Sequence, residues 1–326
     1  MIAQTFRTLE ATQEGRVLTV RIDHPPRNLY DEHICADLEV LVRQVEGDPS
    51  IGAVVFTGKP DDTFITRYDT REILRDTTLA ARLHLPESQA RAMLYLLRAL
   101  RRIPGLERLL LKTPLRGAVT LHRHNAIFRT MNRMDKAFVA AINGMAVGGG
   151  FLLPLACDLR LIADDAGPVG LPEPALGIIP ALGGTTRATR LLGPGRTIEL
   201  LLEGHHLTPA EAEEWGLVNQ VIPRAELLNA AQLRARRLAD FPPGMVARVK
   251  RLAYDGGQGS LARANVLEGA AALTGLATPR ARATVGAFTA RLHGPEEVDA
   301  DQIEAYRLAV DGQLVDEARA EPAGRQ

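Results

Sequence analysis

The chain has 326 residues, of which 39 are basic and 39 acidic, so its formal net charge at pH 7 is +0. A neutral chain gives no overall reason to expect a nucleic acid or an anionic membrane surface as a partner. Hydrophobic residues make up 46% and charged residues 24%, the balance of a globular protein with one large or two small domains.

No segment carries the roughly 18 uninterrupted apolar residues that a membrane-spanning helix needs, and residues 1–19 lack an apolar leader pattern. The two cysteines, Cys35 and Cys157, both lie in apolar helical patterns, which predicts buried free thiols in a reducing compartment. These features together predict a cytoplasmic location.

The first predicted elements alternate between strands and helices. Residues 17–22 and 53–56 are apolar runs typical of strands. The segment between them places its apolar residues on one helical face, at Ile34, Leu38, Leu41, Val42 and Val45. Strands at 138–142 and 159–163, with a helix at 151–157 between them, continue the alternation. This order favours parallel strands joined by crossover helices.

Residues 76–125 form an arginine-rich segment with its own helical stripe at Met93, Leu94, Leu97 and Leu100. We interpret it as a solvated charged face over a small apolar stripe, with a lid or an oligomer contact as alternatives. Its His122-Arg123-His124 run has no cysteine or acidic residue nearby, so no metal site is predicted there.

The last part of the chain is predicted to be helical, at 247–252, 261–276 and 278–291. A further helix is expected at 302–310, before a polar end. We therefore expect a core over residues 1–255 and a C-terminal helical region with an acidic tail over residues 256–326.

The segment from Ile142 to Phe151 is the most informative part of the chain, because three consecutive glycines at 148–150 separate a buried strand from an apolar helix. Glycine allows a sharp turn with no Cβ in the way. The backbone N–H groups at such a helix start point at one place, where an anion or a developing oxyanion is stabilised.

Around this segment the sequence resembles the enoyl-CoA hydratase/isomerase (crotonase) superfamily. The resemblance rests on spaced blocks in the right order, over about residues 15–75 and 128–292. The blocks are Lys136–Gly144, Gly148–Gly150, Cys157-Asp158, Leu171–Pro180, Gly183–Thr185, Glu203-Gly204, Thr208–Ala212 and Gly216–Asn219.

The resemblance implies an α/β, crotonase-like (ClpP/crotonase) fold: a spiral of ββα units with a helical C-terminal region that assembles a homotrimer or a dimer of trimers. Residues 76–125 are longer than the family's usual link and form an extra insertion. The implied substrate is an acyl-CoA thioester, with coenzyme A as part of the substrate, no tightly bound cofactor and no metal.

By resemblance, two backbone N–H groups form an oxyanion hole for the thioester carbonyl. Gly149 supplies one, and residues 64–69, which match the family's Phe-x-Ala-Gly-x-Asp block, place the other at Tyr68. Thr66 and Arg67 stand where the family has Ala and Gly. A positive φ at Arg67 would cost about 1 kcal/mol, and its side chain is alternatively expected to reach toward the substrate.

Glu173 is the predicted acid/base, because the rigid turn Pro172-Glu173-Pro174 follows an apolar strand that would bury the carboxyl and raise its pKa. Hydratases of the family pair this glutamate with a second one, at the position of Leu152 here. Phe151 and Leu152 instead make an apolar wall that excludes water. A single carboxylate favours double-bond isomerisation of an enoyl thioester.

Two alternatives stay open. A hydratase would take its second carboxylate from elsewhere, with Glu87, Asp76 or Asp135 as candidates. A catalytically idle family member would bind an acyl-CoA or a partner protein, as the unusual residues Arg67 and Leu152 suggest.

The remaining expected contacts concern coenzyme A and the helix after the oxyanion segment. Arg27 and Asn28 stand in the loop that lies against the adenosine part in the family, and Lys250 matches the family's C-terminal lysine. Asp69 and Glu72 have capping-box spacing, so Asp69 is predicted to cap the next helix. The full set of expected substrate contacts is Arg27, Asn28, Thr66, Arg67, Gly148, Phe151, Leu152, Pro172 and Lys250.

Overall fold

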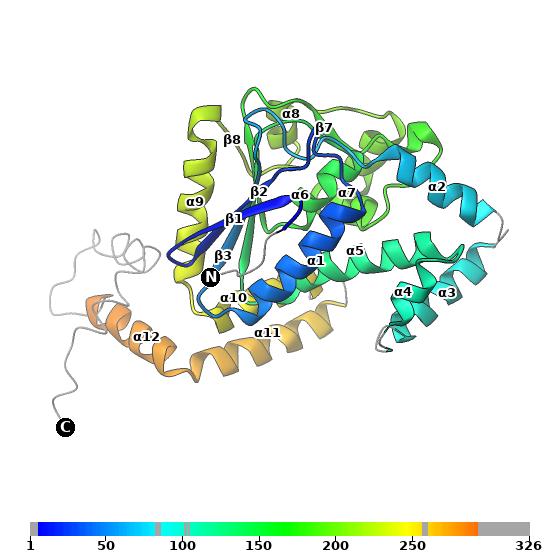
Figure 1. The fold of residues 1–326 in the computed structure, drawn as a ribbon. Helices are drawn as coiled ribbons and strands as arrows, with labels where there is room; N and C mark the ends of the chain where they lie inside the picture. Colours follow the sequence, from blue (N-terminus) through cyan, green and yellow to red (C-terminus); the bar gives the residue numbers. More distant parts are fainter. Residues whose placement is uncertain (1–5, 82–85, 101–102, 104, 256–259, 293–326) are drawn as a thin grey trace. The chain divides into compact units, whose positions relative to one another are not determined.

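The computed structural model describes residues 6–81, 86–100, 103, 105–255 and 260–292 (Figure 1). These residues fall into two compact units, 1–236 and 237–326. The predicted boundary at residue 255 lies inside the second unit, and the predicted helix at 302–310 lies outside the described residues. Among the helices that the structure describes, none combines the length and the apolar character needed to cross a membrane.

In the first unit, six of the described strands form one sheet in the order β1-β2-β3-β4-β6-β8. The strands are β1 (Leu9–Glu14), β2 (Val17–Ile22), β3 (Ala53–Gly58), β4 (Ala137–Ile142), β6 (Leu159–Ala163) and β8 (Gln220–Ile222). β1 and β2 pair antiparallel, and every later pair is parallel, as the alternation of strands and helices predicts. β3 and β4 are buried at every residue, which explains their uninterrupted apolar sequences.

A second, two-stranded parallel sheet pairs β5 (Ala146–Val147) with β7 (Val169–Gly170). Each of these short strands follows a strand of the large sheet, β4 and β6, along the chain. The chain therefore repeats a strand, a short second strand and a helix, which is the ββα unit expected of a spiral. β5 leads directly into the glycine triplet.

Helix α1 (Glu32–Gly47) forms on the predicted stripe, and all five of its predicted apolar residues are buried. Asp31 caps it by accepting hydrogen bonds from the backbone N–H groups of His33 and Ile34, at 2.9 and 3.0 Å. α1 lies against α5 (Arg116–Arg133) (Figure 1). The guanidinium of Arg123 on α5 donates to the Glu39 carboxylate on α1 at 2.7 Å, which fixes this contact.

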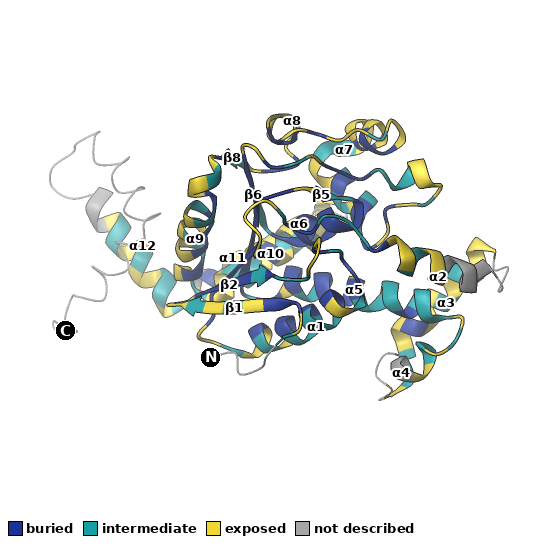
Figure 2. Ribbon diagram, turned by 45° about the horizontal axis from the view of Figure 1, so that its top comes forward, coloured by how far each residue is buried: buried dark blue, intermediate teal, exposed yellow. Residues whose placement is uncertain are grey.

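Residues 76–125 run from within α2 (Thr70–Ala81) through α3 (Glu87–Leu100) and α4 (Leu106–Leu110) into α5. Leu97 is the buried residue of the α3 stripe, whereas Leu94 is 39% exposed. Figure 2 shows α2 and α3 as mostly exposed or intermediate, in contrast to the buried central strands. This segment therefore adds little to the core.

Further described helices of the first unit are η1 (Gly148–Phe151), α6 (Leu152–Ala156), η2 (Glu173–Leu176), α7 (Gly184–Leu202) and α8 (Pro209–Glu214). The boundary between the units falls within α9 (Arg224–Asp240). Taken by itself, the second unit contains α10 (Pro243–Asp255), α11 (Leu261–Leu276) and α12 (Pro279–Leu292). The three helices predicted from the C-terminal sequence coincide with α10, α11 and α12. Cys35 and Cys157 are buried and are not joined in a disulfide, as expected.

Candidate active site

The glycine triplet forms the one-turn helix η1, at the point where β5 ends. Gly148 has a φ of +54°, in the left-handed region that favours glycine. A Cβ built on Gly148 would lie 2.8 Å from Oε1 of Glu173. A Cβ built on Gly149 would lie 2.5 Å from Cβ of Tyr68 and 3.0 Å from its backbone nitrogen. The absence of side chains at these two glycines therefore brings Tyr68 and Glu173 to the same turn of backbone.

The backbone of Tyr30 fixes the orientation of the Tyr68 amide. The Tyr30 N–H donates to the Arg67 carbonyl at 2.8 Å, and the Asp69 N–H donates to the Tyr30 carbonyl at 2.9 Å. The C=O and N–H groups of a trans peptide point in opposite directions. The Tyr68 N–H, which shares a peptide with the Arg67 carbonyl, therefore points away from Tyr30.

Neither the Tyr68 nor the Gly149 N–H donates to a backbone carbonyl of the described residues outside helices and strands. Gly149 lies in the first turn of η1, where N–H groups have no intrahelical acceptor. Two backbone donors thus lie beside each other, with the helix start behind one of them. Chemically, such a pair can bind one carbonyl oxygen and stabilise negative charge on it.

The backbone at Arg67 does not have the positive φ that would strain an arginine there. Among the described residues that are not glycine, only Asn28 and Leu182 have a positive φ. The Arg67 guanidinium donates to the Tyr68 carbonyl at 3.2 Å and to Oγ1 of Thr70 at 3.4 Å. It therefore bonds to its own segment and stabilises the turn after the Tyr68 amide.

The neighbouring residues tie this segment to the rest of the site. The Thr66 carbonyl accepts from the Val147 N–H at 3.0 Å, and the Thr66 hydroxyl donates to the Arg27 carbonyl. Asp69 caps α2 as predicted, because its Oδ1 accepts from the Arg71 N–H at 2.9 Å. The hydrogen bonds from Arg71 hold the pKa of Asp69 below its ordinary value.

The predicted capping box is incomplete. Its second bond would join the Glu72 carboxylate to the Asp69 N–H, but that N–H donates to the Tyr30 carbonyl. Glu72 instead accepts from the Tyr68 hydroxyl at 3.4 Å and pairs with Arg75 at 3.5 Å. The spacing therefore predicts the Asp69 cap correctly. The second bond of the box does not form, because the Asp69 N–H donates to Tyr30 next to the β-bridge between Tyr30 and Tyr68.

Glu173 is the first residue of η2, between Pro172 and Pro174. Its Oε2 atom is buried and has no hydrogen-bonding partner among the described residues. Burial raises the pKa of Glu173 above its ordinary value of 4.5. No cationic side chain of the described residues lies close enough to lower this pKa again. A carboxyl in this setting is suited to exchanging a proton with a bound molecule.

The position of the family's second glutamate lies in an apolar wall. Phe151 is fully buried and Leu152 is 3% exposed. A Cβ built on Gly184 would lie 2.9 Å from Cδ2 of Leu152 and 2.9 Å from Cβ of Pro180. The wall therefore offers no acid/base group at this position.

The three carboxylates considered as substitutes are all in ion pairs. Glu87 is 88% exposed and pairs with Arg91, on α3. Asp76 pairs with Arg75 and Arg116, and Asp135 lies 3.4 Å from Nζ of Lys136. None of them is in the environment of Glu173, whose Oε2 atom is buried and whose carboxyl has no counter-ion within the described part of the chain.

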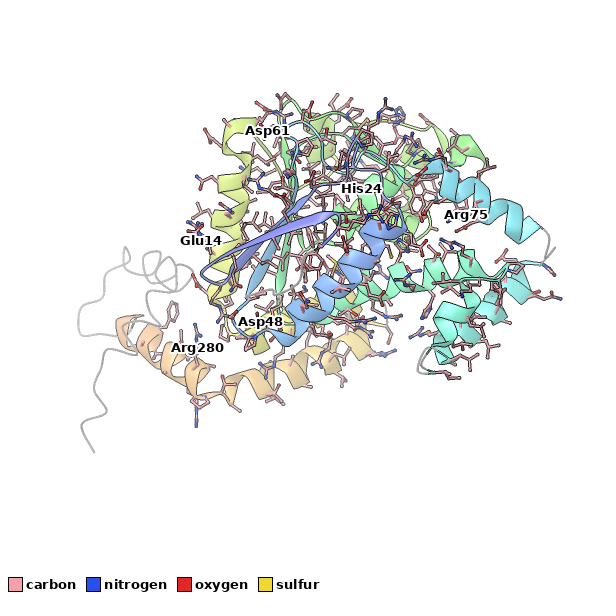
Figure 3. The ribbon with its side chains drawn as sticks, viewed as in Figure 1. Glu14, His24, Asp48, Asp61, Arg75 and Arg280 are labelled. Carbon is pink, nitrogen blue, oxygen red and sulfur yellow. The ribbon has the colours of Figure 1, made fainter. Side chains whose placement is uncertain are left out.

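Asn28 stabilises the loop after β2 from inside the protein. It is 1% exposed; its Nδ2 donates to the Ile22 and Phe64 carbonyls at 3.0 and 2.9 Å, and its Oδ1 accepts from the His24 N–H at 2.7 Å. Its side chain therefore bonds to the backbone of its own loop and of neighbouring segments, and the substrate contact expected for Asn28 stays a prediction. Arg27 beside it is exposed, and Figure 3 shows His24 near the start of α1. Lys250 is buried on α10 of the second unit.

Replacing Asn28 by Ala is expected to lower the free energy of unfolding by about 1–3 kcal/mol, because buried backbone groups lose their partners. The φ of +47° adds strain for alanine. Denaturant unfolding measures the change, with Asn125→Ala at an exposed position of α5 as the control. Equal stability of the two variants would contradict this role.

Two residues near the site were not identified as functional from the sequence. Tyr30 and His124 are fully buried, and their rings lie 5.7 and 6.4 Å from that of Tyr68, centroid to centroid. The His122-Arg123-His124 run was considered only for metal binding. The sequence places His124 on the apolar face of α5. That pattern does not show which aromatic rings the histidine contacts.

Comparison with known proteins agrees with this geometry. The sequence model described as enoyl-CoA hydratase/isomerase matches residues 112–270. The short-chain-enoyl-CoA hydratase of Clostridium acetobutylicum is 28% identical over 240 residues, covering 73% of this chain and 78% of that protein. The carnitinyl-CoA dehydratase of Escherichia coli K12 is 29% identical over 245 residues, covering 75% and 79%.

An enoyl-CoA hydratase structure from Bacillus anthracis matches with a TM-score of 0.69 and 26% identity, covering 87% of this chain and 96% of that one. The predicted crotonase-like fold is confirmed by this likeness. On the matching family model, the curated relatives and the shared fold, the chain belongs to the enoyl-CoA hydratase/isomerase (crotonase) superfamily.

Proposed function

We propose that this chain is an enzyme that forms and quenches the enolate of an acyl-CoA thioester. The Tyr68 and Gly149 N–H groups bind the thioester oxygen, and Glu173 moves the proton. The observation that carries the proposal is the Glu173 carboxyl, whose Oε2 is buried without a hydrogen-bonding partner among the described residues and whose Oε1 faces Gly148, next to those two amides. Its relatives, named as a hydratase and a dehydratase, act in this chemical class.

The two parts have separate tasks in the reaction. Removing a proton from the α- or γ-carbon of an enoyl thioester places negative charge on the carbonyl oxygen. Each backbone donor aimed at that oxygen lowers the barrier by about 3–4 kcal/mol. Glu173 accepts the proton as a carboxylate, and its raised pKa lets it return the proton to the other carbon.

We propose double-bond isomerisation as the specific reaction, because one carboxyl is sufficient for it. The apolar wall at Phe151 and Leu152 supports this choice, since it gives no group that could orient a water. A hydratase is the second candidate, and the names of the relatives favour it. The Oε2 atom of Glu173, buried and without a hydrogen-bonding partner among the described residues, argues against an idle binding protein, because a binding role needs no such group.

The decisive experiment is incubation of the protein in deuterated water with matched 2-enoyl and 3-enoyl thioesters of coenzyme A, followed by mass spectrometry. Isomerisation predicts deuterium at the α- or γ-carbon and interconversion of the two thioesters. Addition of water to the 2-enoyl thioester would support the hydratase instead. Absence of both products across a range of chain lengths would contradict the proposal.

Replacing Leu152 by Glu is expected to increase the addition of water to a 2-enoyl thioester, because it restores a second carboxylate at the family's position. Hydration is measured as formation of the hydroxyacyl thioester by mass spectrometry, because isomerisation of the 2-enoyl thioester also removes its absorbance. Leu152→Gln is the matched control. Glutamine is similar to glutamate in size and is also polar, but it cannot exchange a proton as a carboxylate does. A folded Glu variant without increased hydration would contradict the assignment of Leu152 as the reason for isomerisation.

For the rest of the molecule we propose coenzyme A as the carrier part of the substrate, with Arg27 on the exposed loop as a phosphate contact. We also propose a homotrimer or a dimer of trimers and a cytoplasmic location. Sedimentation of the purified chain tests the assembly. The mechanism requires no metal and no separate cofactor.

A further inference from the structure

Three rings pack together in the first unit, next to the oxyanion-hole segment. The ring centroids of Tyr30 and His124 lie 5.2 Å apart, and those of Tyr30 and Tyr68 lie 5.7 Å apart. Tyr30 and His124 are each 0% exposed. The third side of the triangle, between Tyr68 and His124, is 6.4 Å. The three residues come from the loop before α1, the segment before α2 and the middle of α5.

Two polar atoms of this ring cluster are buried and have no hydrogen-bonding partner within the described part of the chain: Oη of Tyr30 and Nε2 of His124. Nearly all buried polar groups in folded proteins are paired, so each such atom calls for a ligand or a water. The two atoms belong to rings whose centroids lie 5.2 Å apart, so one small group with a donor and an acceptor can serve both.

The protonation states of the two atoms follow from their surroundings. Nδ1 of His124 lies 2.6 Å from the Thr120 carbonyl and must carry the proton, so Nε2 is left as an acceptor. Burial lowers the pKa of His124 to about 4 and raises that of Tyr30 well above its ordinary value. At neutral pH the cluster therefore offers one donor, the Tyr30 hydroxyl, and one acceptor, the His124 imidazole.

Tyr68 connects this cluster to the reaction site. Its amide lies beside Gly149, while its ring packs against Tyr30 and His124. The Tyr68 residue therefore links the backbone amides of the reaction site to the rings that carry the two unpaired atoms. The Tyr68 hydroxyl donates to Glu72 at 3.4 Å, on the side of α2.

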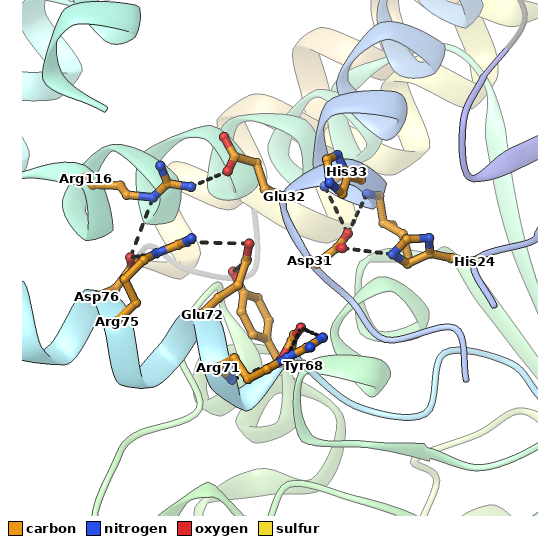
Figure 4. A network of polar contacts seen from close by, with 12 residues as sticks. His24, Asp31, Glu32, His33, Tyr68, Arg71, Glu72, Arg75, Asp76 and Arg116 are labelled. Carbon is orange, nitrogen blue, oxygen red and sulfur yellow. Dashed lines mark hydrogen bonds and ion pairs between the residues drawn. The ribbon is translucent and has the colours of Figure 1, made fainter. Parts of the chain in front are cut away.

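A network of charges holds the elements around the cluster together (Figure 4). Arg116 on α5 donates to Glu32 on α1 and lies 3.7 Å from Asp76 on α2. On α2, Arg75 pairs with Glu72 at 3.5 Å. Because α1, α2 and α5 are tied to one another, the ring cluster between them is a fixed feature of the fold.

We infer that Tyr30 and His124 form a subsite for a hydroxyl group carried by the acyl part of the substrate. A hydroxyl both donates and accepts, so it satisfies the imidazole nitrogen and the tyrosine hydroxyl together. The substrate class is then a short acyl-CoA thioester with a hydroxyl beyond the reacting carbons. This inference rests on the proposed function for the position of the thioester. A water molecule has the same hydrogen-bonding capacity and is the competing occupant.

The test is calorimetric binding of saturated acyl-CoA thioesters, which needs no turnover. Straight chains of four to six carbons are compared in pairs, one with a terminal hydroxyl and one with a methyl group in its place. The wild-type protein is expected to bind one hydroxylated member at least about tenfold more tightly than its methyl counterpart, because a methyl group leaves both buried atoms unpaired.

Tyr30→Phe and His124→Phe should each reduce this preference to about threefold or less, while the Tyr30 backbone bonds to the oxyanion segment remain possible in both. Tyr95→Phe, at a 65% exposed position of α3, is the matched control and should keep the wild-type preference.

Two outcomes would overturn the subsite: no wild-type preference at any chain length, or a preference that survives both variants. Either result means that the cluster holds only a water. Failure of the proposed function has a different signature, namely no deuterium exchange with any enoyl thioester, whatever the binding preference.

Discussion

Replacing Glu173 by Gln is expected to lower kcat for α-proton exchange of an enoyl thioester by about 10²–10⁴-fold, with little change in KM. Gln has the shape of Glu but cannot accept the proton. Binding should persist, because the proposed mechanism assigns the oxygen of the substrate to backbone amides and not to this carboxyl. Deuterium incorporation under steady-state conditions measures both constants.

The wild-type pH profile gives an independent measure of the same group. Burial raises the pKa of Glu173 above 4.5, and a protonated carboxyl cannot act as a base. The value of kcat/KM should therefore fall as the pH decreases through this raised pKa. The residual activity of Glu173→Gln should lack that acidic limb.

Stability measurements separate loss of catalysis from loss of folding. The folded state holds the Glu173 proton more tightly than the unfolded chain, so this group's contribution to stability is lost as the pH rises through the raised pKa. Glu173→Gln removes that loss and should be at least as stable as the wild type at pH 7. An inactive but destabilised variant would contradict this account.

Glu87→Gln is the matched control, because Glu87 is 88% exposed and was a candidate for a second carboxylate. It should keep wild-type turnover. If Glu87→Gln loses activity as Glu173→Gln does, the insertion supplies a catalytic group and the hydratase alternative gains support. Wild-type turnover in Glu173→Gln would remove this residue from the mechanism.

The sequence predicted those elements whose residues carry a strong local pattern. The helical period at Ile34, Leu38 and Val45 predicted α1, and the apolar runs at 53–56 and 138–142 predicted β3 and β4. These runs are unbroken because the strands are buried on both faces. The pattern is therefore visible in each segment alone, without knowledge of the neighbouring strands.

β1 was not predicted, and its composition explains why. Its sequence Leu9–Glu14 contains one large apolar residue. After the buried Leu9 its residues alternate between exposed and intermediate, since the strand lies at the edge of the sheet. Pairing with β2 through a hairpin at Gly15, which has a φ of +57°, forms this strand. A tertiary contact of this kind leaves little trace in hydrophobicity.

The candidate site was predictable only in part. The resemblance pointed to Tyr68, Gly149 and Glu173, and the structure brings these three together. Tyr30 and His124 could not be linked to them, because the contacts join segments that are far apart in the sequence and share no motif. The internal bonds of Asn28 were unpredictable for a similar reason: its position in the loop suggests ligand contact, whereas its hydrogen bonds to the Ile22 and Phe64 carbonyls depend on segments that only the fold brings together.

Replacing Gly149 by Ala is expected to lower kcat and kcat/KM together by about 10²–10³-fold, the effect of losing one oxyanion donor. The new Cβ would lie 2.5 Å from Cβ of Tyr68, closer than two carbon atoms can approach. Either η1 or the Tyr68 segment must shift, and both carry a donor. The two N–H groups then no longer reach one oxygen.

Gly195→Ala on α7 is the matched control, because its Cβ would meet no atom within 4 Å. It should keep wild-type kinetics. Gly149→Ala should stay folded, since overpacking at one site costs about 1–3 kcal/mol. Its loss should also appear in the binding of a stable enolate analogue of the thioester, whereas binding of a saturated thioester changes less. Wild-type kcat in a folded Gly149→Ala variant would mean that the oxygen is bound elsewhere, and that Tyr68 and Gly149 meet for structural reasons alone.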